Sequence, residues 1–169
     1  QEAGPLVVLV GESGAGKFHA ARVLNHLWAG SDTNLNFFSI GDGTEASSAR
    51  EYLKTLTDSA ESQDSQTFRN RYKGRPVLLH NIDRKSDSAS GNKTELIAAL
   101  ERAIKELRKH PGSSRIVVSL SSKTPESLFS EGDYFEIVVP PLRERQEDIE
   151  ALAKHFLSEV NAERGTHLE

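Results

Sequence analysis

The sequence feature that most constrains the fold is the stretch VVLVGESGAGKFHAARVL at residues 7–24. Its first residues continue an apolar run that begins at Leu6 and is bounded by Pro5 and Gly11, which is typical of a strand buried on both faces of a parallel sheet. Glycines and a lysine follow in the spacing G-x-x-x-x-G-K, and a pattern of helical period continues from them. A strand, a glycine loop and a helix in this order predict a loop that holds phosphate with backbone N–H groups, the positive helix end and the charge of Lys17.

The predicted nucleotide-contacting residues are the members of this loop. They are Gly11, Glu12, Ser13, Gly14, Ala15, Gly16, Lys17 and Phe18. Phe18 departs from the motif, which has Ser or Thr after the lysine so that a hydroxyl can hold Mg²⁺. The alternative interpretation is a glycine-rich turn with an exposed lysine. The strand before the loop and the helix after it favour phosphate binding.

The rest of the chain alternates between short apolar runs and helical patterns. We expect further strands at residues 36–40, 77–79, 115–120 and 135–139, and helices from the loop to residue 28 and at residues 44–56, 92–110 and 146–162. The Ser-, Asp- and Gln-rich residues 57–66 are predicted to form a solvated loop, and the basic residues 69–75 a solvated turn. Strands that alternate with helices predict a three-layer α/β/α sandwich with a parallel five-stranded sheet.

Composition limits the chain to one core and few kinds of partner. With 169 residues, of which 36% are hydrophobic, it suits one well-buried domain, which we place at residues 6–162. The net charge of -4 gives no general attraction to nucleic acid or to an anionic membrane, and no apolar run approaches membrane-spanning length. Because cysteine is absent, disulfides and thiol catalysis are excluded, and we expect a cytoplasmic protein. The start at Gln1 without Met indicates an excised segment, so we expect residues 1–5 and 163–169 to be tails, the latter vector-derived.

A second motif narrows the family. The string VVPPLRERQEDIEALAKHFL at residues 138–157, together with GESGAGK in the loop, resembles the AAA+ domain of bacterial enhancer-binding proteins, which activate the sigma-54 form of RNA polymerase. The resemblance implies a P-loop NTPase core of the AAA+ type, ATP binding at subunit interfaces, ring assembly and a role in transcription regulation. The chain ends soon after residue 157, before the helical lid that the family would supply.

The other landmarks of that family are altered. Where the resemblance implies an Asp-Glu pair that holds Mg²⁺ and polarises water, at the end of the strand at residues 77–79, the chain has His80 and Asn81, with Asp83 as the nearest carboxylate. Ser121 stands nearest to the position of the family's polar phosphate sensor. No arginine lies between Lys123 and Arg143, where the family carries residues that reach into a neighbouring subunit's site. The expected polymerase-contacting loop has no glycine between residues 45 and 73.

We therefore predict a degenerate AAA+ module of a bacterial transcriptional regulator, which binds ATP or ADP with little or no hydrolysis and has no catalytic residue. Mg²⁺ is a doubtful ligand, and no other metal site is expected, since His19 and His26 are seven residues apart on one helix. Ser119 lies in no nucleophile-elbow pattern. The expected partner is a protein or the neighbouring domains of a longer regulator, without an ATP-driven hexamer, and self-association stays open. Two alternatives also stay open: a slow but genuine ATPase that drives oligomer remodelling, and a nucleotide-free interaction scaffold.

Overall fold

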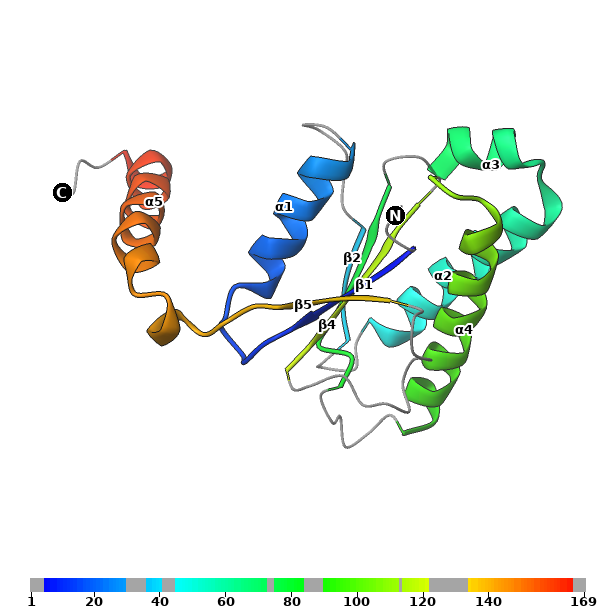
Figure 1. Cartoon of the computed structure of the whole chain (residues 1–169), viewed down its shortest axis with the longest axis horizontal. Helices are drawn as coiled ribbons and strands as arrows, with labels where there is room; N and C mark the ends of the chain where they lie inside the picture. The colour runs from blue at the N-terminus through cyan, green and yellow to red at the C-terminus, as the bar shows by residue number, and fades with distance from the viewer. Residues whose placement is uncertain are drawn as a thin grey trace. The chain divides into compact units, whose positions relative to one another are not determined.

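Five parallel strands form one sheet in the order β2-β3-β4-β1-β5 (Figure 1). The computed structural model describes residues 5–29, 36–40, 45–72, 75–83, 90–112, 114–121 and 134–165. The strands are β1 (Leu6–Val10), β2 (Asn36–Ser39), β3 (Val77–His80), β4 (Ile116–Leu120) and β5 (Phe135–Val138). Each predicted strand is present to within one residue at either end. Strands β1 and β4 are buried along their whole length, as expected for strands in the middle of a covered parallel sheet.

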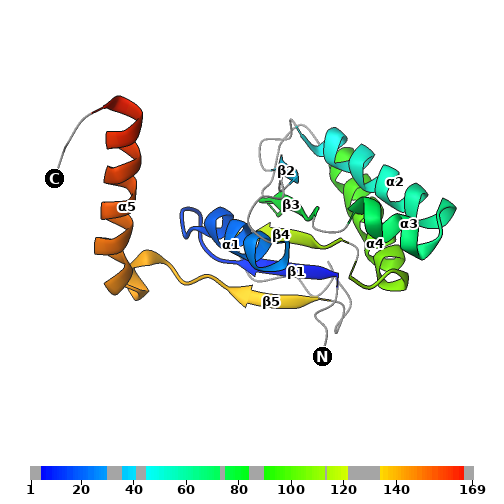
Figure 2. The same cartoon turned by 90° about the horizontal axis from the view of Figure 1, so that it is seen from above.

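Helices cover both faces of this sheet (Figures 1 and 2). On one face, helix α1 (Lys17–Ala29) packs over a cluster that includes Val7, Leu9 and Val117. On the other face lie α2 (Ala46–Ser62), α3 (Ser65–Tyr72) and α4 (Ser90–Lys109), over the larger cluster that includes Leu6 and Val8. Successive β1 side chains enter opposite clusters because side chains alternate along a strand. The predicted α/β/α sandwich is thus confirmed.

The predicted loop at residues 57–66 was wrong, and so was the predicted turn at residues 69–75 as far as Tyr72. Residues 73 and 74 of that turn lie outside the described residues, and the Arg75 N–H group donates to the Tyr72 carbonyl at 3.1 Å. Helix α2 continues to Ser62, and α3 runs from Ser65 to Tyr72. Polar residues fit inside α2 because its own backbone and its neighbours satisfy them: the Thr57 hydroxyl donates to the Leu53 carbonyl at 2.9 Å, and the Tyr72 hydroxyl donates to the Ser59 hydroxyl at 3.1 Å. Asp64 then accepts backbone N–H groups of the first turn of α3, which is how a polar stretch starts a helix.

Residues 140–169 form a second compact unit, separate from residues 1–139. It begins with a short 3-10 turn (Leu142–Glu144) and continues as helix α5 (Glu147–Arg164), close to the helix predicted at residues 146–162. An ion pair at 3.3 Å joins Arg145 to Asp148 in the first turn of α5. The helix ends at Gly165, whose φ of 62° is the left-handed cap conformation. The string of residues 138–157 therefore forms the end of β5, the 3-10 turn and the first part of α5.

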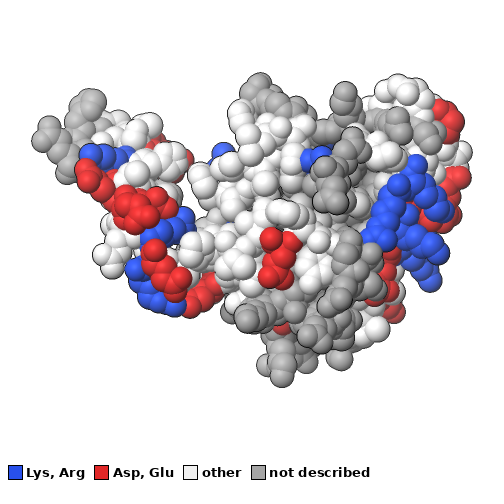
Figure 3. Space-filling model, in the orientation of Figure 1, with Lys and Arg blue, Asp and Glu red and all other residues white. Residues whose placement is uncertain are grey.

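The surface carries charges of both signs. Figure 3 shows Lys and Arg side chains gathered over α4, where Arg102, Lys105 and Arg108 are exposed. Within the described ranges, no helix has both the length and the apolar character needed to cross a membrane.

Candidate functional site

The glycine loop leaves β1 through a narrow passage between two neighbouring strands. The Gly11 N–H group donates to the Leu120 carbonyl at 3.2 Å. A Cβ atom at position 11 would lie 2.5 Å from the Val139 carbonyl oxygen, closer than side-chain atoms approach backbone. The first glycine of the motif is therefore required by the close approach of the backbone that follows β5.

The loop then turns back on itself and opens helix α1. Gly14 and Gly16 have φ angles of 81° and 85°, a left-handed conformation that side chains other than glycine disfavour. The Ala15 N–H group donates to the Glu12 carbonyl at 3.1 Å, and α1 begins at Lys17. Residues 11–18, the predicted nucleotide contacts, thus occupy one turn at the positive end of a helix, the arrangement that binds anions in phosphate loops.

Lys17 is buried inside this turn with its ammonium directed at the loop backbone. The residue is only 3% exposed, and Nζ donates to the carbonyl oxygens of Gly11 at 2.7 Å and Glu12 at 2.9 Å. Burial lowers the pKa of the Lys17 ammonium, and the nearby Asp83 carboxylate acts in the opposite direction. A buried cation held mainly by carbonyl oxygens gains from any anion that enters the loop.

The ends of β3 and β4 meet beside this loop and bring together residues far apart in sequence. Nδ1 of His80 lies 2.7 Å from the hydroxyl oxygen of Ser119, and the same oxygen accepts the N–H group of Asn81 at 3.0 Å. Ser119 is fully buried, so it positions its neighbours and cannot attack a substrate. Asn81 has a φ of 57°, a left-handed conformation that asparagine tolerates better than most residues.

Two further predicted site residues, Asp83 and Ser121, pair with each other. One carboxylate oxygen of Asp83, Oδ2, accepts the Ser121 N–H group at 2.9 Å and the Ser121 hydroxyl at 2.7 Å. The predicted sensor-like serine is therefore already committed to the predicted substitute carboxylate.

An aromatic row links the loop to the end of β3. The Phe18 ring meets the Phe37 ring edge-on at a centroid distance of 5.0 Å, and Phe37 lies 5.9 Å from the His80 ring. Sequence reasoning missed Phe37, because only the pairing of β2 with β3 places it beside His80. Phe18 at the end of the glycine loop and His80 at the end of β3 thus contact the same Phe37 ring.

These residues do not fit a Mg²⁺ ion. Magnesium requires a near-octahedral shell of oxygen ligands, whereas Phe18 offers none and the His80 Nδ1 is engaged with Ser119. The Asp83 oxygen that faces Ser121 already accepts two hydrogen bonds. Among the described residues, no group of three His, Cys, Asp or Glu side chains is placed to hold a metal ion. Desolvation, with a contribution from the charge of Lys17, lowers the pKa of His80 and favours its neutral form.

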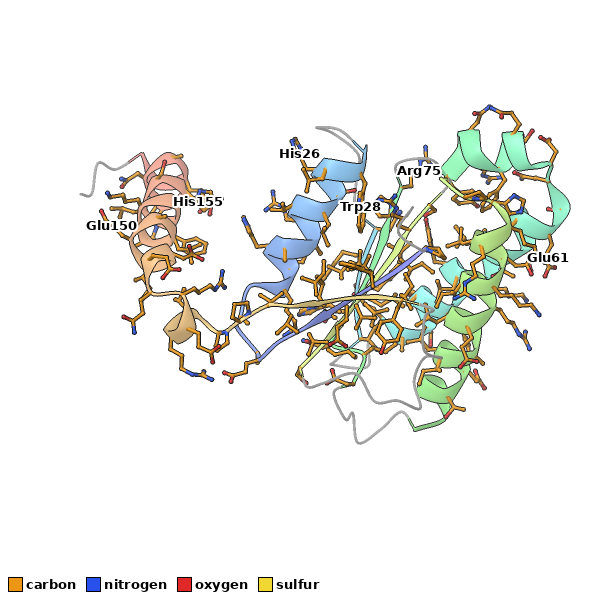
Figure 4. All side chains as sticks on the ribbon, viewed as in Figure 1. His26, Trp28, Glu61, Arg75, Glu150 and His155 are labelled. Atoms are coloured by element: carbon orange, nitrogen blue, oxygen red, sulfur yellow. The ribbon has the colours of Figure 1, made fainter. Side chains whose placement is uncertain are left out.

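The remaining candidates lie away from this site. In Figure 4, His26 points away from α1 into solvent, whereas Trp28 lies toward the strands. Trp28 packs there with the Arg115 guanidinium 4.6 Å from its ring centroid. His19 and His26 are both exposed.

The sheet order, the loop and the buried lysine define the class: the fold is that of AAA+ and other P-loop NTPases. Two solved structures share it. One is a HORMA:CdnC:Trip13 complex from E. coli MS115-1, at 14% identity over 80% of this chain with a TM-score of 0.52. The other is the AAA domain of FIGL-1 in complex with ADP, at 16% identity over 88% of this chain with a TM-score of 0.51. This chain covers 49% and 48% of those chains, about half of each. No family model and no curated protein matches the sequence.

Proposed function

We propose that this domain binds ATP or ADP at residues 11–18 and hydrolyses it slowly or not at all, acting as a nucleotide-responsive module of a larger regulatory protein. The observation that carries the proposal is Lys17, buried in a left-handed glycine turn at the start of α1. In the complex, the backbone N–H groups of the loop would hold phosphate oxygens, and the Lys17 ammonium would exchange its carbonyl partners for them.

The end of β3 supports weak or absent hydrolysis. A positioned base that activates water contributes about 10²–10⁴ in rate, and Asn81 cannot accept a proton. His80 does not replace a carboxylate as a ligand of Mg²⁺. Two separate contributions to phosphoryl transfer are therefore lost at adjacent positions.

We propose further that the module derives from an enhancer-binding type of transcriptional regulator. The string at residues 138–157 supports this relationship, and the ADP bound to the FIGL-1 AAA domain supports the choice of nucleotide. Because no arginine lies between residues 123 and 143, we expect no ATP-dependent hexamer. Light scattering with and without ATP tests this point, and a nucleotide-induced ring would refute it.

Calorimetric titration with ADP and ATP tests the proposed function. The parent domain should bind, and Lys17→Ala should lose measurable affinity because the charge-assisted phosphate contact disappears. Lys105→Ala, which removes an exposed lysine of α4, is the matched control and should bind as the parent does. Equal titrations for the parent and Lys17→Ala would instead support a scaffold whose loop stays empty.

A further inference from the structure

The hydrogen bonds around His80 distinguish the two neutral tautomers of its ring. The Ser119 hydroxyl oxygen accepts the Asn81 N–H group at 3.0 Å, and within the described residues Nδ1 of His80 is the acceptor in reach of its own proton. In the tautomer that gives the buried Ser119 proton an acceptor, the neutral imidazole accepts at Nδ1 and carries its hydrogen on Nε2. No described residue hydrogen-bonds Nε2, and His80 is only half-buried, so this N–H group remains available to a ligand.

The surroundings of His80 favour an anion over a cation. Desolvation and then the Lys17 ammonium at the start of α1 lower the pKa of His80, and the Phe37 ring of β2 lies 5.9 Å from the imidazole. Ser119 faces it from β4. Among the described residues, the carboxylate that acts on His80 is Asp83, which follows β3, raises the pKa of the imidazole, and accepts the backbone N–H group and the hydroxyl of Ser121. The Lys17 ammonium, at the N-terminus of α1, is thus close enough to act on the imidazole, and a cation beside the ring favours phosphate oxygens over Mg²⁺.

We infer that His80 takes the place of the metal ion, donating its Nε2–H group to a phosphate oxygen, so that the domain binds a nucleoside di- or triphosphate without Mg²⁺. The inference rests on the proposed function and specifies how the same site recognises phosphate. Ser119 is a positioning residue in this arrangement, because it holds the proton on Nε2.

The test compares ADP binding in excess EDTA and in excess Mg²⁺, for the parent and for two isosteres of His80. A glutamine side chain places an N–H donor near the position of Nε2, whereas an asparagine side chain reaches only the position of Nδ1. We expect the parent affinity to differ by less than about threefold between the two buffers. In EDTA, His80→Gln should stay within about threefold of the parent, and His80→Asn should bind about tenfold more weakly. His26→Asn, on the exposed side of α1, should bind as the parent does.

Pyrophosphate serves as a second probe, because a contact to phosphate predicts the same loss for His80→Asn without any base or sugar. Binding that tightens more than about tenfold with Mg²⁺, or that is equal in parent and His80→Asn, would overturn the inference and leave the proposed function standing. Absence of ADP binding by the parent in both buffers would overturn both. ¹⁵N-detected imidazole spectra check folding in each case, and a proton found on Nδ1 of His80 in the parent would contradict the inference independently of binding.

Discussion

Nδ1 of His80 lies 2.7 Å from the hydroxyl oxygen of Ser119, across the paired strands β3 and β4. Ser119 is fully buried and also accepts the Asn81 N–H group, so this one hydroxyl bonds both the imidazole and the backbone that follows it. The ends of β3 and β4 thus form one hydrogen-bonded unit of His80, Asn81 and Ser119.

Removing the Ser119 hydroxyl should lower the stability of the domain and change the tautomer of His80. Ser119→Ala leaves the Asn81 N–H group and His80 Nδ1 without their common partner, so we expect a loss of about 1–3 kcal/mol in the free energy of unfolding. Imidazole spectra should show a mixture of tautomers. Urea unfolding measures the first effect. Thr55→Ala, which removes an exposed hydroxyl that bonds only its own helix, is the control and should change stability by less than about 0.5 kcal/mol.

The depressed pKa of His80 predicts a particular pH dependence of stability. Desolvation and Lys17 disfavour the imidazolium in the folded state, so the unfolded chain binds the proton more readily. The contribution of neutral His80 to the free energy of unfolding is therefore fully present above the pKa of the unfolded chain, about 6.5. It is lost as the pH falls from there through the lower pKa of the folded state. Melting temperatures of the parent and His80→Gln between neutral and mildly acidic pH should diverge in this window. Parallel curves would contradict the assignment.

Lys17 should be more valuable for binding than for stability. Its ammonium is desolvated in the unliganded domain, which depresses its pKa and costs free energy. Lys17→Met, which keeps the apolar stem, should leave the free energy of unfolding unchanged or raise it by about 1 kcal/mol. The same variant should lose the rise in melting temperature that ADP gives the parent. A stability loss above about 2 kcal/mol would mean that the lysine is a structural residue.

Restoring the acidic pair should not restore an ATPase. Glutamate is strained at the φ of 57° that Asn81 adopts, so we expect His80→Asp with Asn81→Glu to lose about 1–2 kcal/mol in stability. The double variant should gain some Mg²⁺ affinity in the nucleotide complex. Its rate of ATP hydrolysis should nevertheless stay low without an arginine donor from a neighbouring subunit. Asn81→Gly, which relieves the same φ, is the stability control and should not destabilise. Vigorous turnover by the double variant would show that those two positions alone limit catalysis.

Local patterns were enough to predict the sheet and the glycine loop. The apolar runs of β1 and β4 and the spacing from Gly11 to Lys17 are continuous in sequence, so neighbouring residues determine them. The loop predicted at residues 57–66 was wrong because the hydroxyls of Thr57 and Ser59 form hydrogen bonds inside the helical layer. Composition does not reveal these partners.

The partners within the site could not be predicted in the same way. Phe37 and Ser119 reach His80 only through the pairing of β2, β3 and β4, and nothing near His80 in sequence specifies that register. Sequence singled out Phe18 and His80 as departures from the expected motifs. The sequence could not show that the Phe37 ring contacts both of these residues.

Phosphate release at saturating ATP and Mg²⁺, with Lys17→Ala as the blank, tests the central claim most directly. The account predicts that the parent domain, under conditions where calorimetry shows nucleotide bound, releases phosphate no faster than the blank. Robust Mg²⁺-dependent release that disappears in Lys17→Ala would show that another carboxylate, such as Asp83 or Glu12, has taken over the metal, and that the domain is a working ATPase.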